Sequence, residues 1–464
     1  MNIHAFHGNP PYQNIDKKSK LRGASSSLWK QAVKVARSTG TEMICFITPT
    51  NMFSGSEGDT REMVQDQGDM LVGGQYSIAS VDFDTDDEFE DEFGNPCNVG
   101  VDTCRWMMIK NDDSDSIQVN GDNYERSKLQ YIHRDKEVMK LLNRIMRNSP
   151  ELPRLHFSSS RGYSGPTDFE LDKTDTHQFP IDVNGKLKYA SEMNGQIGRH
   201  LIIAPRISVV DPYYASDRMT EGSSYTMESF TEEEAKALLS ILNTKLYRFV
   251  FNATRVGGRL ARTYMNKLPL LDLSQEWNDA KVMKLFDITE EEKKLFTKKL
   301  TRSKSKKGRS KKGKSRLDKT GEVFTSRNAI KRMFDGYPQR FWQPDAVLCD
   351  PTCGNGNFVL ETIRKKIKLK HDTTQALETT LGVDIMPDNI EECKARVLKE
   401  VGNTPDHRMI VNKNIVCADA LFGFDFIRFK PFRTEESPKS DLSMIELTAP
   451  FLCDIIYPSS RERG

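Results

Sequence analysis

The chain has 464 residues, 37% of them hydrophobic and 29% charged, which predicts a soluble globular protein of two or three domains. No apolar run reaches the roughly 18 residues of a membrane span, and the N-terminus does not resemble a signal peptide, so we expect a cytoplasmic protein with no membrane contact. The net charge is only +2, but segment 82–92 carries eight acidic residues and segment 298–316 carries eleven basic ones, an asymmetry typical of a polyanionic partner. The eight cysteines form no CxxC pair, so we predict reduced thiols and no metal site.

The first 110 residues alternate between predicted strands and helices. Residues 2–7 are expected to form a short strand that ends at the Pro-Pro turn of GNPPY (8–12). A helix follows the serines at 25–27, and MICFIT (43–48) has the continuous apolar character of a buried parallel strand. Further strands are predicted at 76–83 and 103–109. The acidic segment 82–92 is interpreted as a solvated loop.

The βα alternation is lost between about residues 121 and 271, which indicates a separate domain. Within it, a single helix is predicted over 231–251, with Thr231 and Glu234 at the spacing of a capping box. The segment 276–319 is predicted to be a linker, helical at first and then basic and flexible.

After the linker the βα pattern returns. Helices are predicted at 326–335, 357–369 and 387–400, and strands at 346–350, 380–384 and 414–419.

A glycine-rich turn, DPTCGNGNF (350–358), lies between a predicted strand and a predicted helix. Glycines there let the backbone approach a ligand, and a helix N-terminus offers free N–H groups. Asp350, Asp384 and Asp419 each close one of three successive strands, where a carboxylate can bind ribose hydroxyls; a role as helix caps is the alternative. The third glycine of a dinucleotide fingerprint and a phosphate-binding Lys-Ser/Thr are absent from the turn, which favours a nucleoside with a non-phosphate tail, such as S-adenosylmethionine.

These segments resemble the motifs of the amino-methylating DNA methyltransferases, specifically the adenine-N6 enzymes of restriction–modification systems. The matching segments are DPTCGNGNF (350–358), GVD (382–384), CADAL (417–421), GNPPY (8–12), KTGEVFTSRNAIKRMFD (319–335), MICFITPTNMFSG (43–55), FGNPCNVGVDTCRWMMIK (93–110) and the stretch 243–274. The catalytic motif comes first in the chain and the cofactor motifs last, an order similar to the circularly permuted members of the family.

The resemblance implies an α/β, Rossmann-like methyltransferase fold that is circularly permuted, with an inserted mixed α/β target-recognition domain. Residues 1–115 would form its catalytic half, 116–275 the recognition domain, 276–319 the linker and 320–464 the S-adenosylmethionine-binding half, with a covering helix at about 440–455. In a sheet ordered 3-2-1-4-5, the strand before Asn9 is then expected beside the strand before Asp350. The implied function is direct in-line methylation of adenine N6 in a specific sequence of double-stranded DNA, without an obligatory specificity subunit.

The catalytic motif is suited to this chemistry. The lone pair of adenine N6 is delocalised, and two acceptors on its hydrogens, the Asn9 side-chain oxygen and the Pro10 carbonyl, would draw it toward a nucleophilic geometry. Pro10 and Pro11 restrict the backbone, so the acceptors are oriented in advance. Tyr12 offers a stacking face worth about 1–3 kcal/mol to a flipped base. By resemblance, Phe93 is expected to lie on the other face of that base.

The resemblance also implies further site residues. Those expected to bind the cofactor are Phe324, Thr325, Asp350, Pro351, Cys353, Gly354, Gly356, Phe358, Asp384 and Asp419. Those expected to contact DNA phosphates or base edges are Arg248, Arg255, Arg259 and Arg262, for which a solvated helix face is the alternative.

Two other functions stay open from the sequence. NPPY suits any planar amine, so the substrate can instead be RNA or a protein glutamine. A DNA-binding subunit that keeps the fold without catalysis is the second alternative. His4 and His7 also stand in a predicted central strand where apolar residues are expected, which raises the question of whether that strand seats the catalytic turn firmly.

Overall fold

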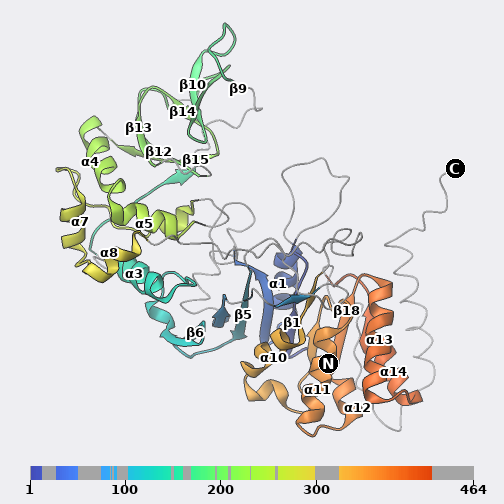
Figure 1. The fold of residues 1–464 in the computed structure, drawn as a ribbon. Helices are drawn as coiled ribbons and strands as arrows, with labels where there is room; N and C mark the ends of the chain where they lie inside the picture. Colours follow the sequence, from blue (N-terminus) through green and yellow to red (C-terminus); the bar gives the residue numbers. More distant parts are fainter. Residues whose placement is uncertain are drawn as a thin grey trace, which may run out of the picture. The chain divides into compact units, whose positions relative to one another are not determined.

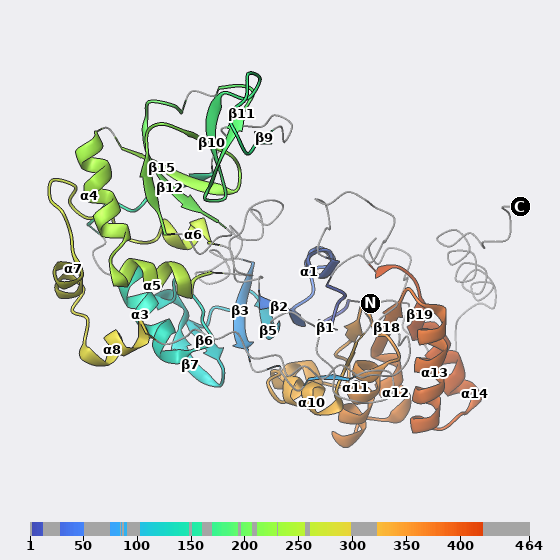
Figure 2. The same cartoon turned by 45° about the horizontal axis from the view of Figure 1, so that its top comes forward.

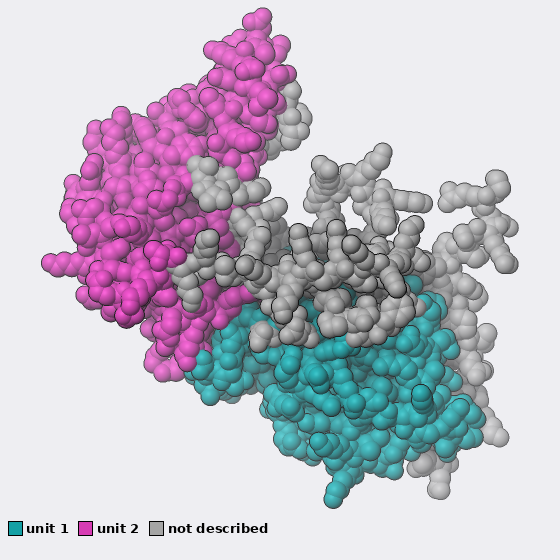
Figure 3. All heavy atoms as spheres, viewed as in Figure 1, with its two compact units in different colours: residues 1–49, 73–123, 303–464 teal, residues 50–72, 124–302 magenta. Residues whose placement is uncertain are grey.

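The computed structural model describes residues 2–12, 28–50, 75–83, 85, 88–90, 103–147, 151–159, 169–193, 196–206, 211–229, 231–255, 260–297 and 323–420. The chain divides into two compact units (Figure 3). Unit 1 comprises residues 1–49, 73–123 and 303–464, and unit 2 comprises residues 50–72 and 124–302.

Unit 1 is a mixed α/β structure built on a nine-stranded, mostly parallel sheet with the order β19-β18-β17-β1-β2-β5-β3-β6-β7 (Figure 1). Its strands are β1 (Ala5–Gly8), β2 (Met43–Pro49), β3 (Tyr76–Asp82), β5 (Thr103–Lys110), β6 (Ser116–Val119), β7 (Asp122–Glu125), β17 (Leu348–Asp350), β18 (Thr380–Asp384) and β19 (Ile415–Cys417). The five strands from β19 to β2 pair in parallel, whereas β5 runs antiparallel to both β2 and β3.

The predicted pairing between the two ends of the chain is confirmed. Ala5 of β1 pairs with Leu348 of β17 on one side and with Met43 of β2 on the other. All four residues of β1 are buried, because the strand lies in the middle of the sheet. The predicted strands at 43–48, 76–83, 103–109 and 380–384 also form, within one residue at each end.

Helices cover the sheet of unit 1 (Figure 2). Their bounds are α1 (Leu28–Ser38), α10 (Arg327–Asp335), α11 (Asn357–Lys368), α12 (Thr373–Glu378), α13 (Pro387–Val401) and α14 (Pro405–Asn414), with a 3₁₀ turn η3 (Gln339–Trp342). Phe334 of α10 and Phe358 of α11 are buried in one cluster with Ala5, Met43 and Leu348, which fixes both helices against the centre of the sheet. In the described part of the chain, no helix is long and apolar enough to span a membrane.

The two histidines of the first strand have defined positions. His4 Nδ1 accepts a hydrogen bond from the Val347 backbone N–H at 3.0 Å, at the start of the pairing with β17. His7 is fully buried, with its ring 5.4 Å from the rings of Phe334 and Phe358. Burial, and then the charge of Lys366, lower the pKa of His7 to about 3, so the ring is neutral and packs as an aromatic core residue.

Lys366 is a second buried titratable group beneath the sheet. Its ammonium nitrogen donates to the carbonyl oxygens of Ala346 and Thr379 at 2.9 and 2.8 Å and to the Thr379 hydroxyl at 2.6 Å. Burial lowers the pKa of Lys366 to about 7. These three bonds tie α11 to the chain before β17 and before β18.

Unit 2 contains two four-stranded sheets, with orders β14-β10-β11-β9 and β13-β12-β15-β8. Its elements are η2 (Arg126–Lys128), α3 (Lys136–Arg147), β8 (Ser158–Ser159), β9 (Phe169–Glu170), β10 (Phe179–Val183), β11 (Lys186–Ala190), β12 (His200–Pro205), β13 (Tyr213–Ala215), β14 (Met219–Thr220), β15 (Ser224–Ser229), α4 (Glu232–Leu242), α5 (Lys245–Ala253), α6 (Arg262–Met265), α7 (Asp279–Leu285) and α8 (Glu290–Leu295). A core of side chains from α3, α4, α5 and β12 holds this unit together.

Two expectations about this region need correction. The single helix predicted over 231–251 is two helices, α4 and α5, which break at Asn243 and Thr244, where the Thr244 hydroxyl bonds back to the Ile241 carbonyl at 2.7 Å. The segment assigned to the start of the linker is helical, as predicted, and forms α7 and α8, but Val282 and Phe286 are buried in the core of unit 2, so this part belongs to unit 2.

The neutral, buried state of His7 predicts a pH dependence of stability. The folded-state pKa of about 3 lies below the ordinary value of 6.5, so between these values only the unfolded chain binds the proton, and stability falls as pH falls. In the wild-type chain, His7 should therefore lower the free energy of unfolding by roughly 1.4 kcal/mol for each pH unit below pH 6.5. We expect this contribution to be absent from His7→Phe. Urea unfolding of both proteins between pH 5 and 7 measures this slope.

His407→Phe is the matched control, because His407 lies partly exposed in the first turn of α14. It should retain the slope of the wild-type chain. An unchanged slope in His7→Phe would contradict the buried neutral imidazole.

Candidate functional site

The turn after β1 is held by its own side chains. Pro10 and Pro11 have no backbone N–H group to pair, so the strand ends at Gly8. The Tyr12 hydroxyl donates a hydrogen bond of 2.9 Å to Asn9 Oδ1. An amide oxygen has two lone pairs, so this bond orients the Asn9 side chain and leaves one acceptor position available. We call Asn9–Tyr12 the catalytic turn, after the role that the sequence predicts for it.

Tyr12 is a neutral phenol at physiological pH. Burial, and then electrostatic interactions with Cys104 and Glu88, raise its pKa well above the ordinary value of 10.0. The hydroxyl therefore keeps its proton and remains the donor toward Asn9. Pro10 is buried and Pro11 is exposed, so the turn is anchored on one side only.

Gly8 brings the catalytic turn into contact with the glycine-rich turn. Its φ is +152°, and a Cβ atom at this position would lie 2.5 Å from Asp350 Oδ1. Any side chain at residue 8 would therefore displace the Asp350 carboxylate. The two turns, far apart in the sequence, meet at this point.

The glycine-rich turn between β17 and α11 is fixed by backbone hydrogen bonds. Cys353 N donates to the Val383 carbonyl at 2.8 Å, and Gly354 N donates to Asp384 Oδ2 at 2.9 Å. Gly356 has a φ of +93°, and a Cβ atom there would collide with Cys393 of α13. Only glycine allows the turn to pack so closely on that helix.

Asp350 and Asp384 end the neighbouring strands β17 and β18, as the sequence predicted, whereas β19 ends at Cys417 and Asp419 lies just beyond it. Asp350 Oδ1 accepts from Thr352 N at 3.0 Å, and burial, together with the charge of Asp384, raises its pKa. Asp384 Oδ1 accepts from Met386 N at 2.9 Å, and burial raises the pKa of this carboxyl also. Asp384 thus serves as a loop anchor, and the carboxylates of Asp350 and Asp384 lie close enough to repel each other.

Three buried polar atoms around the glycine-rich turn have no hydrogen-bond partner within the described ranges. They are Thr325 Oγ1, Thr352 Oγ1 and Asn355 Oδ1. An unpaired buried polar atom costs about 1–3 kcal/mol, so such atoms are usually satisfied by water or a ligand. Their chemistry fits a polar ligand with hydrogen-bond donors and acceptors.

The segment predicted to bind the cofactor before α10 forms a short strand, β16 (Phe324–Thr325). It pairs antiparallel with β4 (Phe89–Glu90), and both of its residues are buried. The Thr325 carbonyl accepts from Asn357 Nδ2 at 2.9 Å, which joins this strand to the N-terminus of α11.

Three other predicted cofactor residues have packing roles here. Phe358 is buried against His7 and Phe334, and Pro351, within the glycine-rich turn, is also buried. A hydrogen bond with Cys393, and burial, raise the pKa of the Cys353 thiol well above its ordinary value. Cys353 is therefore a protonated thiol and not a nucleophile.

Two of the predicted DNA-contacting arginines come together in unit 2. Arg248 pairs with Asp211 at 2.6 Å, and Arg255 donates to Asn252 Oδ1 at 3.2 Å. These four residues, with Pro212, Phe251 and Leu260, line one cavity of about 70 Å³. Arg262 lies on α6 and does not line this cavity.

Some predicted features lie outside the described residues. They are Phe93, Arg259, the basic run 298–316 and the covering helix at about 440–455.

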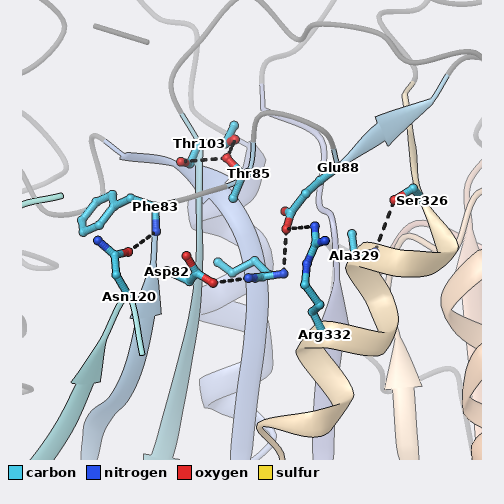
Figure 4. A network of polar contacts seen from close by, with 10 residues as sticks. Asp82, Phe83, Thr85, Glu88, Thr103, Asn120, Ser326, Ala329 and Arg332 are labelled. Carbon is cyan, nitrogen blue, oxygen red and sulfur yellow. Dashed lines mark hydrogen bonds and ion pairs between the residues drawn. The ribbon is translucent and has the colours of Figure 1, made fainter. Parts of the chain in front are cut away.

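The sequence missed a buried ion-pair cluster in the acidic segment 82–92. Glu88 is fully buried, and its carboxylate contacts Arg105 of β5 and Arg332 of α10 (Figure 4). The interpretation of the segment as a solvated loop is therefore wrong at Thr85, Glu88 and Phe89, all of which are buried. An arginine within the apolar strand TCRWMMIK was the signal that a buried acidic partner had to exist.

No protein-family model matches this sequence, and no curated protein matches it. Among solved structures, the type IIG restriction endonuclease BpuSI is 12% identical with a TM-score of 0.24, over 53% of this chain and 42% of that one. The type IIL restriction-modification enzyme MmeI in complex with DNA is 11% identical with a TM-score of 0.28, over 55% of this chain and 45% of that one. The matches span less than half of BpuSI and less than half of MmeI. At these TM-scores they support no statement about function.

The contact between the two turns predicts that replacing Gly8 lowers the free energy of unfolding more than replacing another glycine with a positive φ. Gly402, which ends α13 with a φ of +92° and has open space around it, is a matched control for backbone strain. We expect Gly402→Ala to cost about 1–2 kcal/mol of unfolding free energy, and Gly8→Ala at least about 1 kcal/mol more, because its methyl group meets Asp350. Urea unfolding followed by circular dichroism measures both. Equal costs would contradict the contact.

Proposed function

We propose that this protein is an S-adenosylmethionine-dependent DNA methyltransferase that acts on the N6 amino group of adenine. The observation that carries the proposal is the meeting of the catalytic turn and the glycine-rich turn at Gly8 and Asp350. This contact brings Asn9 and Pro10 to the edge where Asp350 and Asp384 end two parallel strands and where Asp419 follows a third, β19.

The order of the strands supports a permuted methyltransferase fold. With β17 taken as the first strand, the order β19-β18-β17-β1-β2 is the 3-2-1-4-5 order expected from the sequence. In such open sheets, ligands bind outside the carboxyl ends of the strands. The permutation moves the fourth and fifth strands to the start of the chain without changing their neighbours.

The catalytic turn supplies the acceptors for the amine. Asn9 Oδ1, oriented by Tyr12, and the Pro10 carbonyl accept the two hydrogens of the amino group, which localises the nitrogen lone pair. Because both acceptors are fixed before the substrate arrives, little reorganisation accompanies the reaction. Cys353 is a protonated thiol, and the catalytic turn holds no cysteine, which favours direct transfer without a covalent intermediate.

The glycine-rich turn is suited to the cofactor. Asp384 would accept hydrogen bonds from ribose hydroxyls, and the unpaired atoms of Thr325, Thr352 and Asn355 would bind its polar tail. When bound, S-adenosylmethionine supplies a sulfonium-linked methyl group as the electrophile. The Asp350 carboxylate holds Thr352 N and keeps the turn in place.

The arginine cavity of unit 2 and the basic run 298–316 favour a nucleic acid as the partner. Arg248 and Arg255 lie within one small cavity on and after α5, where guanidinium groups can bind phosphate or guanine edges. Double-stranded DNA is the substrate that we propose, with base flipping into the catalytic turn.

The first test of this function is the variant Asn9→Ala. Loss of a pre-oriented acceptor should lower the methylation rate by at least roughly 100-fold, because the amine lone pair is no longer localised. The affinity for S-adenosylmethionine should stay within about twofold of the wild-type value. Transfer of tritiated methyl groups to duplex DNA measures the rate, and mass spectrometry of nucleosides identifies N6-methyladenine.

Asn2→Ala is the control, because Asn2 is exposed ahead of β1 and contributes nothing to the turn. It should methylate at the wild-type rate. If Asn9→Ala kept the full rate, the catalytic assignment would be wrong. If the wild-type chain bound DNA and cofactor but transferred no methyl group, it would be a non-catalytic subunit. RNA and a glutamine peptide, as parallel substrates, separate the remaining alternatives.

Asp384→Ala tests the cofactor site. The variant loses a charged acceptor at the end of β18, so we expect the dissociation constant for S-adenosylmethionine to rise roughly 10- to 100-fold. Asp406→Ala, at an exposed position in the first turn of α14, is the control and should bind normally. Isothermal titration calorimetry measures both values. Equal affinities would place the cofactor elsewhere.

A further inference from the structure

The buried Glu88 carboxylate joins three separate parts of unit 1. Its Oε1 atom accepts from Arg105 Nη1 at 2.6 Å and from Arg332 Nη2 at 3.2 Å (Figure 4). The other terminal nitrogen of Arg105, Nη2, pairs with the carboxylate of Asp82 at the end of β3. The cluster thus connects β5 and α10 through the fully buried Glu88, and β3 through Arg105.

The backbone around Glu88 holds the strand β16. Ser326 N donates to the Glu88 carbonyl at 2.7 Å, and Thr325 and Phe324 pair with Phe89 and Glu90. Ser326 also caps α10, since its hydroxyl accepts from Ala329 N at 3.3 Å. The backbone carbonyl of Glu88 therefore holds the end of β16, and its carboxylate holds α10 through Arg332.

From β16 the contacts continue to the glycine-rich turn. Asn357 Nδ2 donates to the Thr325 carbonyl at 2.9 Å. Arg396 of α13 then donates to Asn357 Oδ1 and to the Asn355 carbonyl, both at 2.7 Å. An unbroken series of hydrogen bonds thus runs from Glu88 to the turn that we propose binds the cofactor.

Glu88 also influences the catalytic turn. Its charge contributes to the raised pKa of Tyr12. Its other carboxylate oxygen, Oε2, is buried and has no hydrogen-bond partner in the part of the chain that the structure describes. Stability alone does not account for such an arrangement, since well-packed apolar residues of similar volume usually stabilise a core as well as a buried ion pair does.

We propose that Glu88 is a positioning residue that sets the affinity of the glycine-rich turn for the cofactor by holding β16 in place. The identity of that cofactor rests on the function proposed above. Arg105 and Arg332 act with Glu88, one from the sheet and one from α10. Within the acidic segment 82–92, Glu88 thus helps to position the proposed cofactor site.

The test is Glu88→Gln, which keeps the size of the side chain and removes its charge. We expect the dissociation constant and the KM for S-adenosylmethionine to rise about tenfold, with kcat within about threefold of wild type, because ground-state binding is what is lost. Glu90→Gln is the matched control: it makes the same change two residues away, at a partly exposed position of β4. It should leave both constants unchanged.

Arg332→Gln provides a second variant, because the Arg332 side chain is 53% exposed and its loss leaves the core intact. It should raise the same dissociation constant in the same direction, by a smaller factor. This variant keeps the test decisive if Glu88→Gln does not fold.

The outcomes separate the two proposals. A folded Glu88→Gln protein with wild-type cofactor affinity, or one that loses kcat alone, would overturn the positioning role. If Glu88→Gln did not fold, wild-type affinity in Arg332→Gln would do the same. A wild-type chain that binds no S-adenosylmethionine would overturn the proposed function and the positioning role with it.

Discussion

The parallel pairing of β1 with β17 is the interaction on which the rest of unit 1 depends. It joins residues 343 positions apart, as the bond between His4 and Val347 shows, and it buries all of β1 in the centre of the sheet. Because Gly8 ends β1 and Asp350 ends β17, the same pairing brings the catalytic turn against the glycine-rich turn. The proposed methyl transfer requires the substrate amine at the catalytic turn and the cofactor at the glycine-rich turn to lie side by side, and this strand pairing is what brings the two turns together.

Three buried carboxylates of unit 1 each accept hydrogen bonds from their own set of donors. Asp350 is held by one backbone N–H group, Asp384 by two backbone groups and the Asn389 side chain, and Glu88 by two guanidinium groups. Burial raises the pKa of all three carboxyl groups, so the desolvation of each outweighs the stabilisation that its donors give to the charged form; perturbed pKa values of this kind are common at functional sites.

Much of the fold was predictable, because local sequence signals mark its elements. Glycine, proline and aspartate punctuate the apolar strands after residue 323, and the strand predicted at 380–384 forms with those bounds. The strands predicted at 346–350 and 414–419 form over the shorter ranges Leu348–Asp350 and Ile415–Cys417. The break between α4 and α5 was missed, because the apolar periodicity continues across Asn243 and Thr244. The burial of Glu88 was also missed: its partners lie 17 and 244 residues away, and no local pattern in an acidic run reveals such contacts. Likewise, the burial of His7 was not predictable, because the aromatic rings and the Thr362 hydroxyl that surround it come from α10 and α11, far away in the sequence.

The central claim is that the two turns together methylate adenine in DNA. The most direct measurement is the modified-base content of DNA from cells that express the chain, read by sequencing of modified bases and by mass spectrometry. The account predicts N6-methyladenine within one defined sequence in cells with the wild-type chain, and its absence in cells with the Asn9→Ala chain. DNA without N6-methyladenine in wild-type-expressing cells, or with equal amounts in both, would contradict the account.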